Sequence, residues 1–395
     1  MLESDANCLV ITFGSVEFDS RVQRQVAALG LNFRVTLLGP IPRSRGWWDN
    51  VDELIDIKAD TVGFLRSLSS LEIFRAAMGL FLLLRFFRWF HWSPRYLSFW
   101  ALKALARHDR SGFDMVVVND VDPIPLALRI SRGAPVVADL HEFAPGEVAI
   151  DSLQSKLTSR YRSWICRKYL ARCAAITVPS GSVGDLYRSD FGVESEVVRS
   201  VPGYVDIGPS AIQEGNIQLV HHGFYSPTRG VELLLEAFAG AFEIGTLNLV
   251  LSGAPTSDLK VLATKLEIPE SRLVFHQFVS PEHLIPFLNR FDVEVIFIPT
   301  DVVNEKAALP NKFFEAIQAR LGVLSGPMPE VAREIERHVI GAVTTSFRPD
   351  DLARELRSLT AERVRYWKKQ SNQLAKELNW ENEAPDYPGY LVRTL

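Results

Sequence analysis

The stretch ALPNKFFEAIQARLGVLSGPMPEVAREIERHVIG, residues Ala308–Gly341, decides how the rest of the chain is interpreted. Pro310 can begin a helix, because its missing N–H would be unpaired in a first turn, and apolar residues recur after it at helical spacing. Gly322 is expected to end this helix, and a short buried strand and a second helix over residues 330–337 follow. The stretch is therefore one unit of a chain in which strands and helices alternate.

Three polar residues of the first helix suit an anion and a sugar. Asn311 and Lys312 lie at its N-terminus, where backbone N–H groups, the helix dipole and a cation can together hold a diphosphate. Glu315 lies one turn further along and can accept hydrogen bonds from the vicinal hydroxyls of a sugar. This helix is therefore a candidate nucleotide-sugar site.

The order of these pieces resembles the nucleotide-sugar-binding segment of glycosyltransferase family four, which has the two-domain GT-B fold. The resemblance implies that Glu315 holds the ribose of the donor. It also implies an earlier Glu, which is Ala307 in this chain, while the nearest acid, Glu305, is two residues away. The implied fold is α/β, with two facing Rossmann-like, doubly wound parallel-sheet domains and a C-terminal crossover helix.

Length and composition limit the class of protein. The 395 residues suffice for two domains. A net charge of -4 gives no global basic field, so no nucleic acid is expected as a partner. Three scattered cysteines fit a reducing cytosol better than a disulfide framework or a zinc site. The acidic N-terminus does not resemble an export signal, and no run reaches the ~18 apolar residues of a spanning helix, so we expect a cytoplasmic protein.

The domain boundary is expected near residues 202–215, where proline, glycine and polar residues concentrate. We predict an N-terminal acceptor-side domain over residues 1–205 and a C-terminal nucleotide-sugar-binding domain over residues 206–370. Residues 371–395 are expected to form a helix and tail that cross back to the first domain. This last expectation depends on Asn379–Glu381, which resembles the start of the final helix of the family.

Polar residues of the first half follow predicted strands, at the edge where open α/β sheets bind ligands. Asp19 and Arg21 open the first helix, and the resemblance places this loop beside the acceptor or the pyrophosphate of the donor. The alternative is that Asp19 only caps the helix and Arg21 is solvated. His141 and Glu142 follow the strand 135–138, and the resemblance brings His141 to the donor sugar and Glu142 to the acceptor side. An ordinary polar histidine is the other interpretation.

A glycine turn in the second half precedes the predicted helix 231–238 and can hold a diphosphate. Gly223 begins this turn and Arg229 brings a cation to the helix. In the family a second cation is usual, and Phe224 occupies its place. The resemblance therefore assigns the β-phosphate to Arg229 and Lys312 together. The alternative is that the glycines only make a turn.

Two further donor positions come from the resemblance alone. Gly253 follows the strand 247–251 and corresponds to a glycine that faces the nucleotide. Phe278 and Val279 lie where members of the family touch the base, although Gln277 stands where a glycine is usual.

Residues 73–105 have the most unusual composition of the chain. Phe, Trp and Leu dominate, and cations interrupt them at intervals that gather charge on part of a helix: Arg75, Arg85, Arg88 and Arg95. This pattern is typical of a helix or helix pair in the interface of an anionic membrane, and it carries too much charge for a spanning helix. The alternative is a helical pair packed within the first domain. A second basic helix, over residues 155–172, faces lipid, an anionic acceptor or solvent.

Together these features predict a glycosyltransferase that moves a sugar from a nucleotide-diphosphate sugar to a glycan or a lipid-linked acceptor at the inner face of the cell membrane. The resemblance implies a retaining transfer in which the protein neutralises the leaving diphosphate, and the β-phosphate takes the proton of the acceptor. No cofactor and no metal are expected. Asp120 and Asp122 have the spacing of a metal pair, but we favour a loop role.

Two other functions fit parts of the pattern. A nucleotide-sugar 2-epimerase shares the GT-B architecture, but its soluble substrates leave residues 73–105 unexplained. A non-catalytic GT-B protein that binds glycan or organises a glycan-assembly complex would explain the losses at Ala307 and Phe224.

Overall fold

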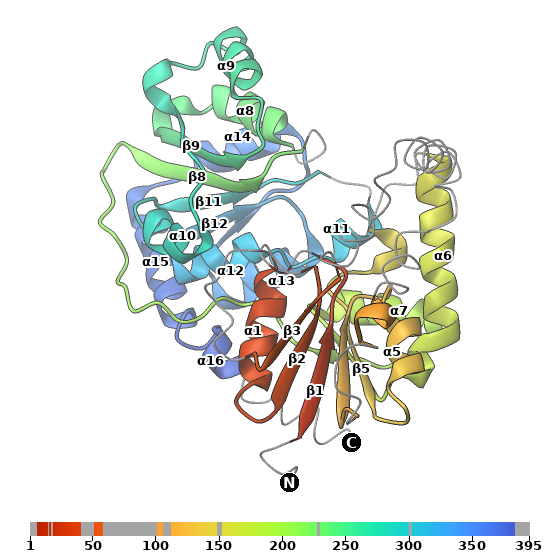
Figure 1. Cartoon of the computed structure of the whole chain (residues 1–395). Helices are drawn as coiled ribbons and strands as arrows, with labels where there is room; N and C mark the ends of the chain where they lie inside the picture. The colour runs from red at the N-terminus through yellow and green to blue at the C-terminus, as the bar shows by residue number, and fades with distance from the viewer. Residues whose placement is uncertain are drawn as a thin grey trace, which may run out of the picture. The chain divides into compact units, whose positions relative to one another are not determined.

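A computed structural model of the protein describes residues 6–14, 16, 19–40, 51–57, 101–105, 112–147, 152–226, 230–299 and 302–383. The chain forms two compact units, each built on a parallel sheet (Figure 1). Unit 1 comprises Met1–Val198, Val302–Asn304 and Ala384–Leu395. Unit 2 comprises Arg199–Asp301 and Glu305–Glu383.

Among the described residues of unit 1, seven strands form one sheet in the order β3-β2-β1-β4-β5-β6-β7, with all neighbours parallel. The strands are β1 (Asn7–Ile11), β2 (Arg34–Gly39), β3 (Glu53–Asp56), β4 (Met115–Asn119), β5 (Val136–Asp139), β6 (Ala175–Val178) and β7 (Glu196–Val197). The helices are α1 (Ser20–Leu29), α5 (Ile124–Ile130), α6 (Leu153–Tyr169) and α7 (Gly181–Phe191), with the short turns η2 (Ala144–Gly146) and η3 (Leu170–Arg172).

The central strands of unit 1 are apolar on both faces, which is why the sequence shows continuous apolar runs rather than alternation. Every residue of β4 is buried, as is every residue of β5. Helices on both faces of a parallel sheet produce this pattern. The strand order reverses between β1 and β4, because β2 pairs with one side of β1 and β4 with the other. Crevices for ligands form at such a reversal, outside the carboxyl ends of the strands.

Six strands form the sheet of unit 2 among its described residues, in the order β10-β9-β8-β11-β12-β13, and they too are parallel. They are β8 (Ile217–Phe224), β9 (Gly245–Ser252), β10 (Leu273–Phe275), β11 (Val293–Ile296), β12 (Gly322–Ser325) and β13 (Gly341–Val343). The helices are α8 (Val231–Ala239), α9 (Thr256–Lys265), α10 (Pro281–Leu288), α11 (Val303–Ala307), α12 (Asn311–Gln318), α13 (Pro329–His338), α14 (Pro349–Arg357), α15 (Ala361–Leu374) and α16 (Trp380–Glu383), with η4 (Phe242–Ile244) and η5 (Glu270–Arg272). Helix α11 begins in unit 1 and ends in unit 2.

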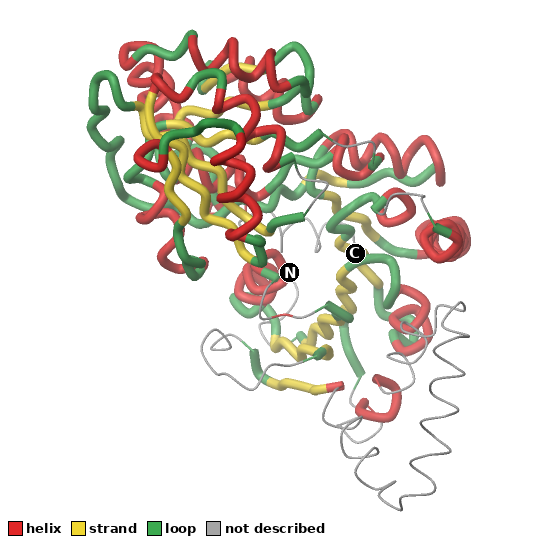
Figure 2. Tube along the Cα trace, turned by 90° about the horizontal axis from the view of Figure 1, so that it is seen from above, coloured by secondary structure: helices red, strands yellow, loops and turns green. Residues whose placement is uncertain are grey.

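Helices cover both faces of this second sheet (Figure 2). On one face, Phe313, Phe314 and Ile317 of α12 are buried in a core with residues of β11 and β12. On the other face, Leu234 and Leu235 of α8 belong to a separate core that α14 also enters. The sequence prediction of an α/β protein with two doubly wound parallel sheets is confirmed.

One boundary in the deciding stretch differs from its prediction. Helix α12 ends at Gln318, and Gly322 begins β12 instead of capping the helix. The left-handed turn is made by Arg320, with φ 63°. Its guanidinium donates to the carbonyl oxygens of Gln318 and Val205 at 2.6 Å each, and these bonds hold a non-glycine residue in a conformation that it seldom adopts. The glycine signal was therefore misassigned by one element.

Residues 73–100 of the predicted membrane-facing stretch lie outside the described residues. Of the ranges that the structure describes, none contains a helix that is long and apolar enough to cross a bilayer.

Candidate functional site

In unit 2 the strand order reverses between β8 and β11, and ionisable side chains gather near the end of β8. His222 lies near this end and is 3% exposed. Its Nδ1 atom lies 2.9 Å from Oε2 of Glu294 on β11, and its Nε2 atom lies 2.9 Å from Oε2 of Glu315 on α12. One buried ring thus joins two strands and the helix that the sequence singled out.

The two carboxylates decide the charge of this ring. Burial alone would lower the pKa of His222, but Glu294 and then Glu315 outweigh burial and raise it to about 9. His222 is therefore an imidazolium at neutral pH. In that form both ring nitrogens carry a proton, and each donates to one carboxylate.

Gly223 follows His222 and brings a cation close to the backbone. Its φ of 129° favours glycine, because a side chain there would be strained. The Nζ atom of Lys312 lies 3.5 Å from the point where a Cβ atom of residue 223 would be. Lys312 belongs to the first turn of α12, where the backbone N–H groups and dipole of the helix also favour an anion. Asn311 occupies the first position of the helix and is exposed.

The remaining predicted donor residues are placed less closely. Gly253 has a φ of 74°, and the ring of Phe224 comes within 3.3 Å of the point where its Cβ atom would lie. Phe224 is 64% exposed and Phe278 is 67% exposed, so both rings are open to a partner. Arg229 lies outside the described residues. The structure therefore brings together Gly223, Lys312 and Glu315, while the nucleotide roles of these positions stay predictions.

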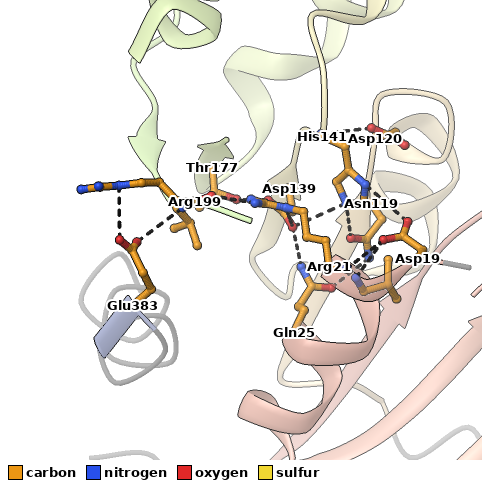
Figure 3. Close-up of polar contacts among 12 residues, drawn as sticks. Asp19, Arg21, Gln25, Asn119, Asp120, Asp139, His141, Thr177, Arg199 and Glu383 are labelled. Atoms are coloured by element: carbon orange, nitrogen blue, oxygen red, sulfur yellow. Dashed lines mark hydrogen bonds and ion pairs between the residues drawn. The ribbon is translucent and has the colours of Figure 1, made fainter. Parts of the chain in front are cut away.

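Unit 1 has its own ionisable group, near the carboxyl ends of β4 and β5 (Figure 3). Arg21 of α1 makes a bidentate ion pair with Asp139, with Nε–Oδ2 at 2.9 Å and Nη2–Oδ1 at 2.5 Å. Both side chains are buried, at 8% and 1% exposed. Burial would raise the pKa of Asp139, but Arg21 and His141 hold it well below its ordinary value. Gln25 and Thr177 also donate to this carboxylate, at 2.9 and 2.6 Å.

This geometry separates the two expectations for the first helix. Asp19 caps α1, because its Oδ1 atom accepts from the backbone N–H groups of Arg21 and Val22 at 3.1 Å each. Arg21 is not solvated, as the alternative held, but donates to Asp139 and to the carbonyl oxygen of Val198 at 2.6 Å. The acceptor-side role of both residues remains a prediction.

His141 is surrounded by acceptors. Its Nε2 atom lies 2.9 Å from Oδ1 of Asn119 and 3.6 Å from Oδ2 of Asp139, and its Nδ1 atom lies 3.4 Å from Oδ2 of Asp19. Its backbone N–H donates to Oδ1 of Asp120 at 3.1 Å. Burial would lower the pKa of His141, but Asp120, then Asp139 and Asp19, raise it to about 9. At neutral pH His141 can donate hydrogen bonds and cannot act as a base.

Glu142 has a different electrostatic environment. Desolvation of its carboxyl group and the nearby charges of Glu147 and Asp120 raise the pKa of Glu142 to about 7. Its Oε2 atom accepts from Nδ2 of Asn304 at 3.0 Å. Glu142 can therefore exchange a proton near neutral pH, which suits the acceptor-side position predicted for it.

Sequence reasoning missed the buried partners of the site. His222 and Glu294 were not singled out, and the available signals were a histidine pair before a glycine turn and one acid inside the apolar run VEVIFIP. Asp120 and Asp122 do not act as a pair toward one ligand: Asp120 faces His141, and Asp122 lies 3.4 Å from Arg162. Within the described residues, no group of three or more His, Cys, Asp or Glu side chains is arranged to hold a metal ion.

Comparison with known proteins relates both halves of the chain to glycosyltransferases. Residues 72–208 match the family described as Glycosyltransferase Family 4, and residues 206–377 match the family described as Glycosyl transferases group 1. No curated protein matches the chain in sequence.

Several solved structures share its fold. Sucrose-phosphate synthase from Thermosynechococcus elongatus superposes with a TM-score of 0.69 at 14% identity, over 98% of each chain. HepE from Anabaena, in complex with UDP and glucose, has a TM-score of 0.66 at 14% identity, also over 98% of each chain. The trehalose 6-phosphate synthase from Burkholderia multivorans has a TM-score of 0.61 at 10% identity, over 99% of this chain and 98% of the other.

The charge of His141 can be tested by NMR titration. Asp120→Asn removes the largest electrostatic cause of its raised pKa, while asparagine tolerates the left-handed backbone at this position, φ 67°. We expect the pKa of His141 to fall from about 9 yet stay above the ordinary histidine value, because Asp139 and Asp19 remain. Asp185→Asn, an exposed position on α7, is the control and should leave this titration unchanged. An equal pKa in the Asp120→Asn and wild-type proteins would contradict the assignment.

Proposed function

The chain is a glycosyltransferase of the family-four type with the GT-B fold, and from this premise we propose that it transfers a sugar from a nucleotide-diphosphate sugar to a glycan or lipid-linked acceptor at a membrane surface. We propose further that the transfer retains the anomeric configuration and needs no metal. The observation that carries the donor assignment is the cluster of Glu315, Lys312 and Gly223 at the strand reversal of unit 2.

The donor would be held by complementary charge. The carboxylate of Glu315 is 25% exposed and can accept from two neighbouring hydroxyls of a ribose. Lys312, the first turn of α12 and Arg229 would hold the diphosphate, since a lysine supplies a point charge and an arginine a bidentate contact. HepE of Anabaena has been solved with UDP and with UDP-glucose, which supports a nucleotide-sugar donor for this chain.

The chemistry follows from the charges of the groups. The bond between the anomeric carbon and the diphosphate oxygen breaks, and the acceptor oxygen forms its bond on the same face of the sugar. The acceptor proton goes to the departing β-phosphate. His141, as an imidazolium, would donate a hydrogen bond as negative charge develops, in line with the principle that donors aimed at developing charge lower the barrier.

Helix α6 supports the membrane part of the proposal within the described residues. Residues 153–172 contain no Asp or Glu and carry the cations Lys156, Arg160, Arg162, Arg167, Lys168 and Arg172. Of these, Arg162 turns toward Glu147 and Asp122, whereas Lys156 and Arg160 are exposed.

Apolar groups share this face of α6. Leu153 is 52% exposed and Trp164 is 42% exposed. The rings of Tyr161 and Trp164 stack at 6.0 Å, and Nζ of Lys168 lies 5.0 Å from the centroid of Trp164. Cations beside an exposed aromatic ring are typical of helices that lie on anionic bilayers, where the ring enters the headgroup layer.

Nucleotide binding provides the first test. UDP, GDP, dTDP, ADP and CMP are compared for their effect on the melting temperature, because a ligand that binds only the native state raises it. We expect one of them to stabilise the wild-type protein by several degrees, about 2.7 kcal/mol at a concentration 100 times Kd. Glu315→Ala should remove this stabilisation, while Glu336→Ala, an exposed acid on α13, should keep it. If no nucleotide stabilises the wild-type protein, the donor assignment is wrong.

The stereochemistry and the metal requirement are tested on the transfer reaction itself. With the sugar donor of the selected nucleotide, proton NMR of the first product should show the anomeric configuration of the donor. The rate should be the same with and without EDTA, because Lys312, Arg229 and the helix N-terminus supply the positive charge. An inverted product would exclude retention, and loss of activity that Mg²⁺ restores would exclude metal independence.

Vesicle binding tests the role of α6. Lys156→Glu combined with Arg160→Glu should weaken binding to phosphatidylglycerol vesicles at least about tenfold, since each cation near such a surface contributes about 1 kcal/mol. Trp164→Ala should weaken it further. The control combines Lys265→Glu with Lys369→Glu, which change the same charge at exposed positions of unit 2 and should leave binding intact. Unchanged binding of the α6 variant, or no binding by the wild-type protein, would overturn this part.

A further inference from the structure

We propose that His222 is a positioning residue for the donor: by bridging Glu294 and Glu315, it orients the carboxylate of Glu315 toward the ribose hydroxyls. This inference rests on the proposed function, in which Glu315 contacts the ribose. It adds a residue pair, His222 and Glu294, that the sequence pattern of the site does not contain.

The three side chains form a line from the core to the surface. Glu294 is 0% exposed, the His222 side chain is 4% exposed, and the Glu315 side chain is 25% exposed. The backbone N–H of His222 also donates to Oε1 of Glu294 at 3.4 Å, so the inner carboxylate contacts both the ring and the main chain of residue 222. The ring is thus fixed from inside, and its outer nitrogen is left for Glu315.

The outer bond uses only one oxygen of Glu315. Oε2 accepts from Nε2 of His222 at 2.9 Å, and in the described part of the chain Oε1 has no hydrogen-bond partner. A carboxylate with one oxygen fixed cannot rotate without breaking a charge-assisted bond, which is stronger than a neutral one. Oε1 is therefore held ready for a hydroxyl group, and the donor would not have to order this side chain on binding.

A purely structural histidine would not need the second carboxylate. Glu294 and the main chain already satisfy the inner side of the ring, and the Nε2 proton could be met by water at the partly exposed edge. The structure instead places a helical acid there, on the same helix face as Lys312. That arrangement transmits the rigidity of the sheet to the donor-binding helix.

The bridge depends on the charge of the ring. A neutral imidazole carries one N–H and can donate to only one of the two carboxylates. The charged groups around His222 are Glu294 from β11, Glu315 from α12 and the amine of Lys312 from the same helix, close to Gly223. Because the pKa of His222 is raised, the bridge is complete at neutral pH and is lost as the pH rises through about 9.

The test compares UDP with 2′,3′-dideoxy-UDP, which lacks the hydroxyls, by isothermal titration calorimetry on the full chain. In the wild-type protein UDP should bind at least about tenfold more tightly, since each hydrogen bond to a charged group contributes roughly 1.5–3 kcal/mol. In His222→Gln this ratio should fall toward one, as in Glu315→Gln. His283→Gln, whose side chain is 78% exposed on α10, is the matched control and should keep the wild-type ratio.

The pH profile gives a readout that a general loss of stability would not move. For the wild-type protein the preference for UDP should decline as the pH rises through about 9, and for His222→Gln it should be small and flat. Ionisation of uracil affects both nucleotides and all variants alike, so it cancels in the ratio. Since the ratio does not depend on the fraction of folded protein, a partly unfolded variant still reports on the proposal.

The outcomes separate the inference from the proposed function. If Glu315→Gln loses the preference for UDP and His222→Gln keeps it at every pH, the positioning role is overturned and the donor site stands. If both variants keep the preference, the ribose contact is wrong and the inference falls with it. Glu294→Gln provides a second variant should His222→Gln not fold: it leaves both ends of the outer bond in place, and it should shift the pH at which the preference declines to a lower value.

Discussion

Burial of both faces of a parallel sheet is the constraint on which the chemistry of this protein depends. Helices on each face require apolar strands, and β4 and β5 are buried along their whole lengths. Ionisable groups are then concentrated near the carboxyl ends of the strands, where the strand order reverses. The two units follow the same rule independently, with His141 after β5 in unit 1 and His222 near the end of β8 in unit 2.

Both units also solve the cost of buried charge in the same way. A buried carboxylate is expensive unless it is paired and hydrogen-bonded, and such pairs fix geometry more than they add stability. Asp139 accepts from Arg21, Gln25 and Thr177, so its position is set from several elements at once. Glu294 has the single histidine as its charged partner, and this partner passes the constraint on to Glu315. In each unit the innermost acid orients a group that lies closer to solvent.

The sequence was sufficient for the fold and for one half of each polar contact. Helical spacing after Pro310 and the alternation of strands and helices were enough to predict two doubly wound sheets, because local patterning decides such elements. Glu315 and Lys312 were found because they open one helix. His222 and Glu294 were not, because their bond to Glu315 joins strands and a helix far apart in the chain, and no local period encodes it. Arg320 was missed for a related reason: long-range bonds to the linker stabilise its left-handed turn, which local propensity assigns to glycine.

The charge of His141 limits the mechanism more than its position does. Surrounded by Asp19, Asp120 and Asp139, it holds its proton at neutral pH and cannot take one from an acceptor hydroxyl. The acceptor proton must then go elsewhere, either to the leaving phosphate or to a carboxyl group such as Glu142, whose pKa near 7 permits exchange. Transfer with retention favours the phosphate, because acceptor and leaving group lie on one face of the sugar and the phosphate oxygen gains negative charge as the bond breaks. A permanently charged His141 is suited to that step, since it can donate to the developing charge without competing for the proton.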